Sequence, residues 1–177
     1  MVSSLQDSPG PRGQHVDVLV VGAGFSGLYL LHRLRGAGFN VRVLDKAADI
    51  GGTWYWNRYP GARCDVESMQ YAFSFCPELE QEWVWTEKYA TQPEILHYAN
   101  HVADRFDLRP DIQLNTTVLS ATYDEDHQRW SIELDGGGQM SADFCVMATG
   151  CLSTTNTPDF DGLDTFTGPV YHTGQWP

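Results

Sequence analysis

A glycine turn between an apolar strand and a helix limits the fold of this chain more than any other feature of its sequence. Residues 16–21 (VDVLVV) are almost continuously apolar, which is typical of a parallel strand buried on both faces. Gly22-Ala-Gly-Phe-Ser-Gly27 follows at once, and the apolar residues from 25 to 37 recur at helical spacing. A second short strand, residues 41–44, ends in Asp45. This order predicts one βαβ unit with a right-handed crossover.

The glycines of this GxGxxG pattern suit a bound dinucleotide. Gly22 permits the tight turn, Gly24 lets the backbone approach a pyrophosphate, and Gly27 lets helix and strand pack closely. The helix N-terminus adds oriented N–H groups and a partial positive charge. Asp45 follows Gly27 by 18 residues, where a carboxylate would accept hydrogen bonds from ribose and repel a 2′-phosphate. The pattern favours FAD or NAD over NADP at this turn; the alternative is a packing turn without a ligand.

The remaining segments predict an α/β fold, a parallel sheet with a small antiparallel insertion. Residues 91–94 (TQPE) match a capping box, and the apolar residues from 95 to 106 predict the helix that follows it. Further strands are expected at 112–123, 129–134 and 142–147, with a tight turn at 135–138 (DGGG). Residues 46–75 lack clean periodicity, so they are interpreted as a functional loop or as elements that the pattern does not reveal.

Composition excludes several other classes of protein. Hydrophobic residues make up 42% of the 177 residues, which is enough for a packed core. The net charge of −12 would repel nucleic acid and anionic membrane surfaces, and no apolar run approaches the roughly 20 residues that span a bilayer. The four cysteines show no metal-ligand spacing and are expected to be free thiols of a cytoplasmic protein. His97 and His101 lack a third ligand, so no metal site is predicted.

Two further segments resemble the N-terminal portion of Baeyer–Villiger monooxygenases of the phenylacetone or steroid type. Residues 51–65 (GGTWYWNRYPGARCD) look like one stretch of that family. Residues 166–177 (FTGPVYHTGQWP) match its FxGxxxHTxxWP signature at every fixed position, whereas related flavin N- and S-oxygenases lack the final Trp-Pro. Residues 147–150 (MATG) are similar to a strand end in flavoproteins that bind two dinucleotides. The resemblance covers residues 16–177.

This resemblance implies a set of FAD-binding residues. Those expected to hold the pyrophosphate are Gly22, Gly24, Phe25, Ser26 and Gly27. Asp45 would bind the adenosine ribose, at a position where many relatives have Glu. Those expected to line the flavin side are Gly52, Thr53, Trp54 and Trp56, with Tyr71 near the flavin and the backbone of Val118 at the adenine.

A second set is implied for NADPH, the other cofactor of the family. Arg63, Cys64 and Asp65 match the stretch that faces its nicotinamide, and Asp65 is the expected catalytic residue, placed between the two cofactors. A carboxylate there would orient the carboxamide and hold a catalytic arginine, which no residue of this chain matches. His172 is expected to anchor a linker through both ring nitrogens.

The implied reaction uses NADPH and O₂ to convert ketones to esters or lactones. We expect a disordered leader at 1–15, the first segment of an FAD-binding domain at 16–152 and a linker carrying the signature at 153–177. The chain ends before a second dinucleotide motif, so it is expected to be inactive alone, with a complementing chain as one partner to consider. Two alternatives stay open: a non-enzymatic FAD- or NAD-binding fragment, and another FAD-dependent oxidoreductase such as a disulfide reductase, against which the lack of a CxxxxC pair weighs.

Overall fold

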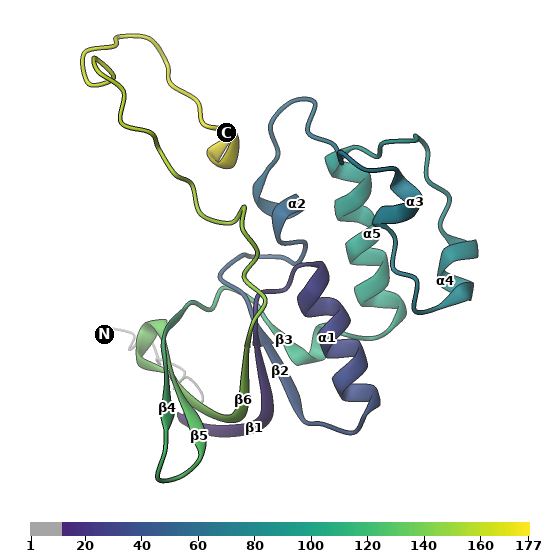
Figure 1. Cartoon of the computed structure of the whole chain (residues 1–177), viewed down its shortest axis with the longest axis vertical. Coiled ribbons are helices and arrows are strands. Elements are labelled where there is room, and N and C mark those ends of the chain that lie inside the picture. Colours follow the sequence, from purple (N-terminus) through teal and green to yellow (C-terminus); the bar gives the residue numbers. More distant parts are fainter. Residues whose placement is uncertain (1–11) are drawn as a thin grey trace, which may run out of the picture.

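One six-stranded sheet organises residues 12–177, the part of the chain that the computed structural model describes (Figure 1). The strand order is β3-β2-β1-β6-β5-β4. The strands are β1 (Arg12–Val21), β2 (Val41–Leu44), β3 (Ile112–Gln113), β4 (Val118–Asp124), β5 (Arg129–Leu134) and β6 (Gln139–Met147). Strands β3, β2, β1 and β6 are parallel, while β4 and β5 pair antiparallel and β5 joins β6 antiparallel. The predicted α/β class, with a parallel sheet and an antiparallel insertion, is confirmed.

The helices lie mainly beside the parallel half of the sheet (Figure 1). The α-helices are α1 (Phe25–Gly36), α2 (Thr53–Trp56), α3 (Ser68–Tyr71), α4 (Pro77–Glu82) and α5 (Gln92–Arg105). Three short 3₁₀ turns are η1 (Arg109–Asp111), η2 (Asp135–Gly137) and η3 (Thr173–Gln175). Among these helices of residues 12–177, none is long and apolar enough to cross a membrane.

Strand β1 is central because it is buried on both faces. Val18 and Val20 pack against Leu28 and Leu31 of α1 in one core cluster. Leu19, on the opposite face, packs in a second cluster that includes residues of β5 and β6. Two-sided burial explains the continuous apolar run that predicted this strand. The βαβ unit β1-α1-β2 forms as predicted, with β1 and β2 parallel.

Strand β1 begins at Arg12, four residues before the predicted start of the fold. Its first residues pair only with β6, from Arg12 opposite Gln139 to His15 opposite Ser141, because β2 joins β1 only from Val18 onward. A strand segment with one neighbour and polar side chains lacks the apolar run that marks the rest of β1. Residues 12–15 therefore belong to the sheet and not to a disordered leader, and residues 1–11 lie outside the described part.

Two other details differ from the sequence predictions. The predicted strand 112–123 is broken into β3 and β4, which lie at opposite edges of the sheet, by a turn in which Asn115 has a φ of 52°. The capping box at 91–94 does not form, although the helix starts there: Thr91 makes no side-chain cap, and Glu94 instead accepts hydrogen bonds from the backbone N (2.8 Å) and hydroxyl (2.9 Å) of Thr86. In both places tertiary contacts override a local pattern: the Asn115 N–H donates to the Ala47 carbonyl (2.9 Å), and Glu94 bonds to Thr86 instead of taking part in a cap.

Candidate functional site

A cavity of about 480 Å³ opens at the carboxyl ends of β1, β2 and β6, where ligands bind in open parallel sheets. Eleven of the fifteen residues expected to bind cofactors line it: Gly22, Gly24, Phe25, Ser26, Asp45, Gly52, Thr53, Trp54, Trp56, Tyr71 and Val118. Residues of the predicted MATG strand end line it too. A second cavity of about 750 Å³, bordered by α3, α4 and residues 83–88, is lined by none of the fifteen. Most of the sequence-predicted binding residues thus converge on one cavity.

The floor of this cavity is a close crossing of two glycine segments. Gly22 has a φ of +113°, and a Cβ there would lie 2.4 Å from the carbonyl oxygen of Ala148. Gly52 has a φ of +56°, and its Cβ would lie 2.8 Å from the Cα of Gly24. Gly27 does not line the cavity; it is buried beneath the turn, where a Cβ would lie 1.9 Å from the carbonyl oxygen of Gly22. Side chains at these three positions would clash with neighbouring backbone atoms.

The N-terminus of helix α1 lies at this cavity. The first N–H groups of a helix have no partner within it, and Gly24, the N-cap, supplies no side-chain acceptor. Phe25 and Ser26, the first two helical residues, both line the cavity. No acidic residue lies in the first turn of α1. The helix terminus can therefore donate backbone hydrogen bonds to an anion such as a pyrophosphate.

Asp45 lies on the cavity wall at the end of β2. Its carboxylate accepts one hydrogen bond from the backbone N of Ala23 (2.6 Å) and one from the backbone N of Ala47 (2.8 Å). Each carboxylate oxygen has a further lone pair, so a ribose hydroxyl can still be accepted. The acid predicted for the ribose is thus already bonded to the glycine turn.

An aromatic wall closes the side of the cavity that the resemblance assigns to the flavin. The Trp54 indole donates a hydrogen bond from Nε1 to the Tyr71 hydroxyl oxygen (2.8 Å). The Phe25 ring meets Tyr71 edge-on at 5.2 Å and stacks on Phe73 at 5.1 Å. Burial raises the pKa of Tyr71 above its usual value; the Trp54 hydrogen bond opposes this, and the charges of Cys64 and Asp65 add to it. Tyr71 therefore keeps its proton near neutral pH.

The cavity also has lining residues that the sequence analysis missed. They are Val21, Leu44, Lys46, Gly51, Thr116, Thr117, Ser153 and Thr154. Lys46 donates a hydrogen bond to the Ser153 carbonyl (3.2 Å) and lies 5.2 Å from the centre of the Trp56 ring. Its position directly after a predicted parallel strand was a usable signal. For the two threonines the signal was hidden, because the strand prediction ran through the turn that contains them.

Arg63, Cys64 and Asp65, the strip expected at the nicotinamide, do not line the cavity. Cys64 is buried and packs in the same cluster as Trp54, so the strip starts directly behind the cavity wall. Arg63 donates hydrogen bonds to Glu87 (2.9 Å) and to the Tyr89 carbonyl (3.1 Å). The side chain of Asp65 is exposed. Of the three, Cys64 is thus the residue that packs with an aromatic residue of the cavity wall.

Four of the six histidines fall into three different settings. His97 and His101 both pack against the Trp83 ring, at 5.2 and 5.3 Å between ring centres. His172 accepts a hydrogen bond at Nδ1 from Gly174 N (3.0 Å) and bonds through Nε2 to the Asn156 carbonyl (3.2 Å). Both ring nitrogens of His172 are therefore engaged within the C-terminal segment.

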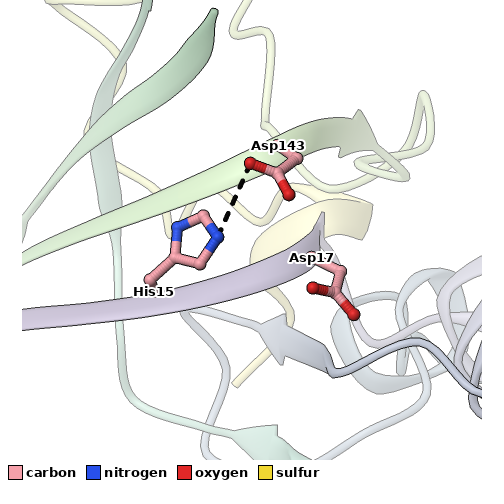
Figure 2. A group of neighbouring side chains, drawn as sticks. All are labelled: His15, Asp17 and Asp143. Carbon is pink, nitrogen blue, oxygen red and sulfur yellow. Dashed lines mark ion pairs between the residues drawn. The ribbon is translucent and has the colours of Figure 1, made fainter. Parts of the chain in front are cut away.

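The third setting is a small cluster on β1 and β6, distant from the cavity along the strands. In Figure 2, His15 on β1 faces Asp143 on β6, at 3.5 Å, with Asp17 beside them. One candidate ligand atom from each residue lies within 4.8 Å of the others, whereas ligands around a tetrahedral zinc ion lie about 3.4 Å apart. Asp17 also accepts a hydrogen bond from Asn40 N (2.7 Å). The cluster is an exposed His–Asp pair with a neighbouring carboxylate.

Comparison with known proteins gives similar sequences over nearly the whole chain. The family described as an NAD(P)-binding Rossmann-like domain matches residues 20–83. A Baeyer–Villiger monooxygenase from Pseudooceanicola batsensis is 49% identical over 166 residues, which is 93% of this chain and 30% of that protein. The phenazine N-monooxygenase PhzNO1 from Lysobacter antibioticus is 47% identical over 92% of this chain and 30% of its own length.

Solved structures give the same result. An oxidised steroid monooxygenase bound to NADP superimposes with a TM-score of 0.86 at 61% identity, covering 93% of this chain and 32% of that one. The OTEMO complex with FAD and NADP superimposes with a TM-score of 0.85 at 41% identity, covering 92% and 30%. This chain spans about 30% of the length of the curated relatives it matches. It has a Rossmann-like fold and is, over nearly all of its length, a homologue of Baeyer–Villiger and related flavin monooxygenases.

Proposed function

We propose that this chain is the FAD-binding part of a Baeyer–Villiger monooxygenase that uses NADPH and O₂ to convert ketones to esters or lactones. The observation that carries the proposal is the cavity at the strand ends, which gathers eleven of the fifteen expected cofactor residues around the N-terminus of α1. The homologues, among them a solved complex with FAD and NADP, supply the identity of the cofactors.

The residues of the cavity fit the parts of FAD. The unpaired N–H groups of Phe25 and Ser26 would donate to the pyrophosphate, and the glycine turn would let it approach the backbone. Asp45 would accept hydrogen bonds from the adenosine ribose, and the backbone of Val118 would meet the adenine. Trp54, Trp56 and Tyr71 would exclude water from the flavin side. Bound FAD would supply the oxygenation chemistry, and the protein would orient and shield it.

Asp65 is the residue that we assign to the NADPH side. Asp65 is exposed and follows Cys64, which packs in the same cluster as the wall residue Trp54. Arg63 is held by Glu87 and by the Tyr89 carbonyl, which fixes the backbone of the strip. In the whole enzyme Asp65 would orient the nicotinamide carboxamide and a partner arginine, whose positive charge would stabilise negative charge beside the flavin. The buried Cys64 could contribute only backbone groups.

The first test is the visible absorption spectrum of the purified 177-residue chain. Bound flavin gives absorption bands that the protein alone lacks, and the proposal predicts that added FAD is retained through gel filtration. A chain that retains none, although its circular dichroism shows a folded α/β protein, would contradict the binding role. Restored in a full-length enzyme, the same sequence is expected to consume NADPH with a ketone and O₂ and to form an ester.

N-oxygenation is the second candidate, because PhzNO1 is similar to this chain at 47% identity. The complete FxGxxxHTxxWP match at residues 166–177 favours ketone oxygenation. Product analysis with a ketone and a phenazine supplied together to the restored enzyme would separate the two. A non-enzymatic flavin-binding fragment would retain FAD and oxygenate neither compound.

The four free cysteines suit a reducing compartment, and we propose that the protein is cytoplasmic.

A further inference from the structure

We propose that Asp45 is a positioning residue that holds the glycine turn and the neighbouring loops in the binding-competent arrangement before a nucleotide arrives. This role is additional to a contact with ribose and deepens the proposed function, on which the ligand-binding part of its test rests. In the GxGxxG fingerprint, the only role given to the acid at this position is a hydrogen bond to the ribose of the ligand. In the structure, the acid is bonded to the protein around the cavity.

The carboxylate of Asp45 joins the turn after β1 to the loop after β2. One oxygen accepts the backbone N–H of Ala23, between the first two glycines of the turn, at 2.6 Å. The other accepts the backbone N–H of Ala47 at 2.8 Å. Short hydrogen bonds from N–H groups to an ionised acceptor are stronger than those between neutral groups. A single side chain thus fixes two of the segments that border the cavity.

The backbone of Asp45 adds a third segment. Its N–H donates to the Gln113 carbonyl of β3 at 3.0 Å, and its carbonyl accepts the N–H of Thr116 at 2.9 Å. Thr116 begins the pair of threonines that line the cavity after β3. All the polar groups of Asp45 are therefore engaged, and they connect the loops that follow β1, β2 and β3.

Ala23 is the contact at which loss of the carboxylate would matter most. The residue has no solvent exposure, so its N–H cannot exchange the carboxylate for bulk water without movement of the turn. Its carbonyl accepts the N–H of Gly51, which precedes the glycine in contact with Gly24. Displacement of Ala23 would therefore also separate the two glycine segments that form the cavity floor. Asp45 acts on the floor through Ala23.

The residue type also fits this role. A carboxylate accepts hydrogen bonds at both oxygens, as Ala23 and Ala47 require, whereas an asparagine amide offers one accepting oxygen and turns an NH₂ group toward the other N–H. The short aspartate side chain reaches back to its own loop and to the adjacent turn. Glutamate, which the resemblance gives for many relatives, places its carboxylate one methylene further out. The proposal therefore distinguishes Asp45→Asn from the wild type even though the two side chains have nearly the same shape.

Amide hydrogen exchange of the 177-residue chain without added nucleotide tests the proposal directly. In Asp45→Ala the amide of Ala23 is expected to exchange about 10- to 100-fold faster than in the wild type, and that of Ala47 also faster. Asp45→Asn is expected to protect at most one of the two amides. Asp17→Ala is the matched control, because Asp17 also accepts a backbone N–H, that of Asn40 at 2.7 Å, but does not line the cavity. It should accelerate Asn40 and leave Ala23 unchanged.

Two results would overturn the proposal at this stage. One is wild-type exchange at Ala23 in both Asp45 variants. The other is a uniform acceleration that includes the β5–β6 pair, which would describe a general loss of stability and not a local clamp. Asp45→Asn keeps the size and polarity of the side chain, so it preserves the test if Asp45→Ala does not fold.

The second arm compares FAD with an analogue whose adenosine lacks both ribose hydroxyls. A positioning role predicts that Asp45→Ala weakens the analogue too, by about tenfold or more, while the lost ribose contact adds to the weakening of FAD. A loss confined to FAD would return Asp45 to ribose recognition alone and overturn the proposal. If the wild-type chain bound neither ligand, the proposed function would fail, whereas the exchange of Ala23 would still decide the role of Asp45.

Discussion

Two alanine substitutions in helix α1 should change stability in opposite directions. Gly27 and Gly36 lie in the same helix, so alanine has the same propensity advantage over glycine at both positions. They differ in what a new methyl group would meet. At Gly36 nothing lies within 4 Å of the added Cβ, whereas at Gly27 the Cβ would lie 1.9 Å from the carbonyl oxygen and 3.0 Å from the carbonyl carbon of Gly22. The pair therefore isolates the close packing of α1 on the glycine turn.

The magnitude follows from this geometry. A Cβ contact of 1.9 Å must open by at least 1.1 Å to reach 3.0 Å, the shortest distance that real Cβ atoms show. Both clashing atoms belong to the backbone of Gly22, so no side-chain rotation can relieve them. Overpacking of this kind costs about 1–3 kcal/mol, and the propensity gain offsets up to about 1 kcal/mol of it. We expect Gly27→Ala to lose about 2 kcal/mol and Gly36→Ala to gain about 0.5 kcal/mol.

Urea and thermal unfolding of the 177-residue chain, followed by far-UV circular dichroism, measure both effects. For a domain of this size a loss of about 2 kcal/mol lowers the Tm by about 4–8 °C, and the gain at Gly36 raises it by about 1–2 °C. Equal urea m-values in the two variants would show that the unfolded reference state is unchanged. If Gly27→Ala proved as stable as Gly36→Ala, the reasoning that α1 presses on the turn would be refuted.

Three further outcomes are expected. Gly24→Val should abolish flavin retention. A Cβ at this position would already lie 3.4 Å from the Gly52 Cα, and the larger valine side chain would occupy the space for the pyrophosphate. Unchanged flavin absorbance would remove the turn from the site. Burial, followed by the charges of Arg35 and Arg33, lowers the pKa of His32. The stability that neutral His32 contributes is therefore present above about pH 6.5 and is lost as the pH falls through the lowered pKa. Urea midpoints should decline between pH 7.5 and 5, and they should decline less in His32→Gln. Asp65→Ala should slow flavin reduction by NADPH in a restored full-length enzyme while leaving FAD bound. It should hardly alter FAD binding or stability of the isolated chain, in which this side chain is exposed. Stopped-flow flavin reduction at the wild-type rate would show that Asp65 is only a structural residue.

The sequence predicted those parts of the fold that local patterns determine. Strand β1, helix α1, strand β2 and the hairpin strand β5 lie where periodicity and the glycine turn indicated. The failures have a common physical cause. The start of β1 at Arg12 depends on pairing with β6, and the break after β3 depends on a turn at Asn115 that separates two segments of similar polarity. Such long-range pairing leaves no periodic signal in the segment itself.

The same distinction applies to the candidate site. Gly22, Gly24 and Asp45 were found from a local sequence pattern, whereas Trp54 was found through the family resemblance, and all four line the cavity. The contacts of Asp45 with Ala23, across 22 positions, could not be read from the spacing, because the spacing is the same whether the acid holds a ribose or a turn.

Few charged side chains line the cavity, which affects how it would bind a ligand. Asp45 and Lys46 are the two charged residues that line the cavity within residues 12–177, and each already bonds to the backbone. Besides the remaining lone pairs of Asp45, the groups that can meet a ligand include the N–H groups at the start of α1 and the side chains of Trp54, Trp56 and Tyr71. Fixed dipoles and rings bind by position, since they cannot reorient toward a misplaced ligand as a flexible charged side chain can. Correct placement of the turn therefore determines binding, and for that reason a residue that holds the turn, as we infer for Asp45, would matter as much as one that touches the cofactor.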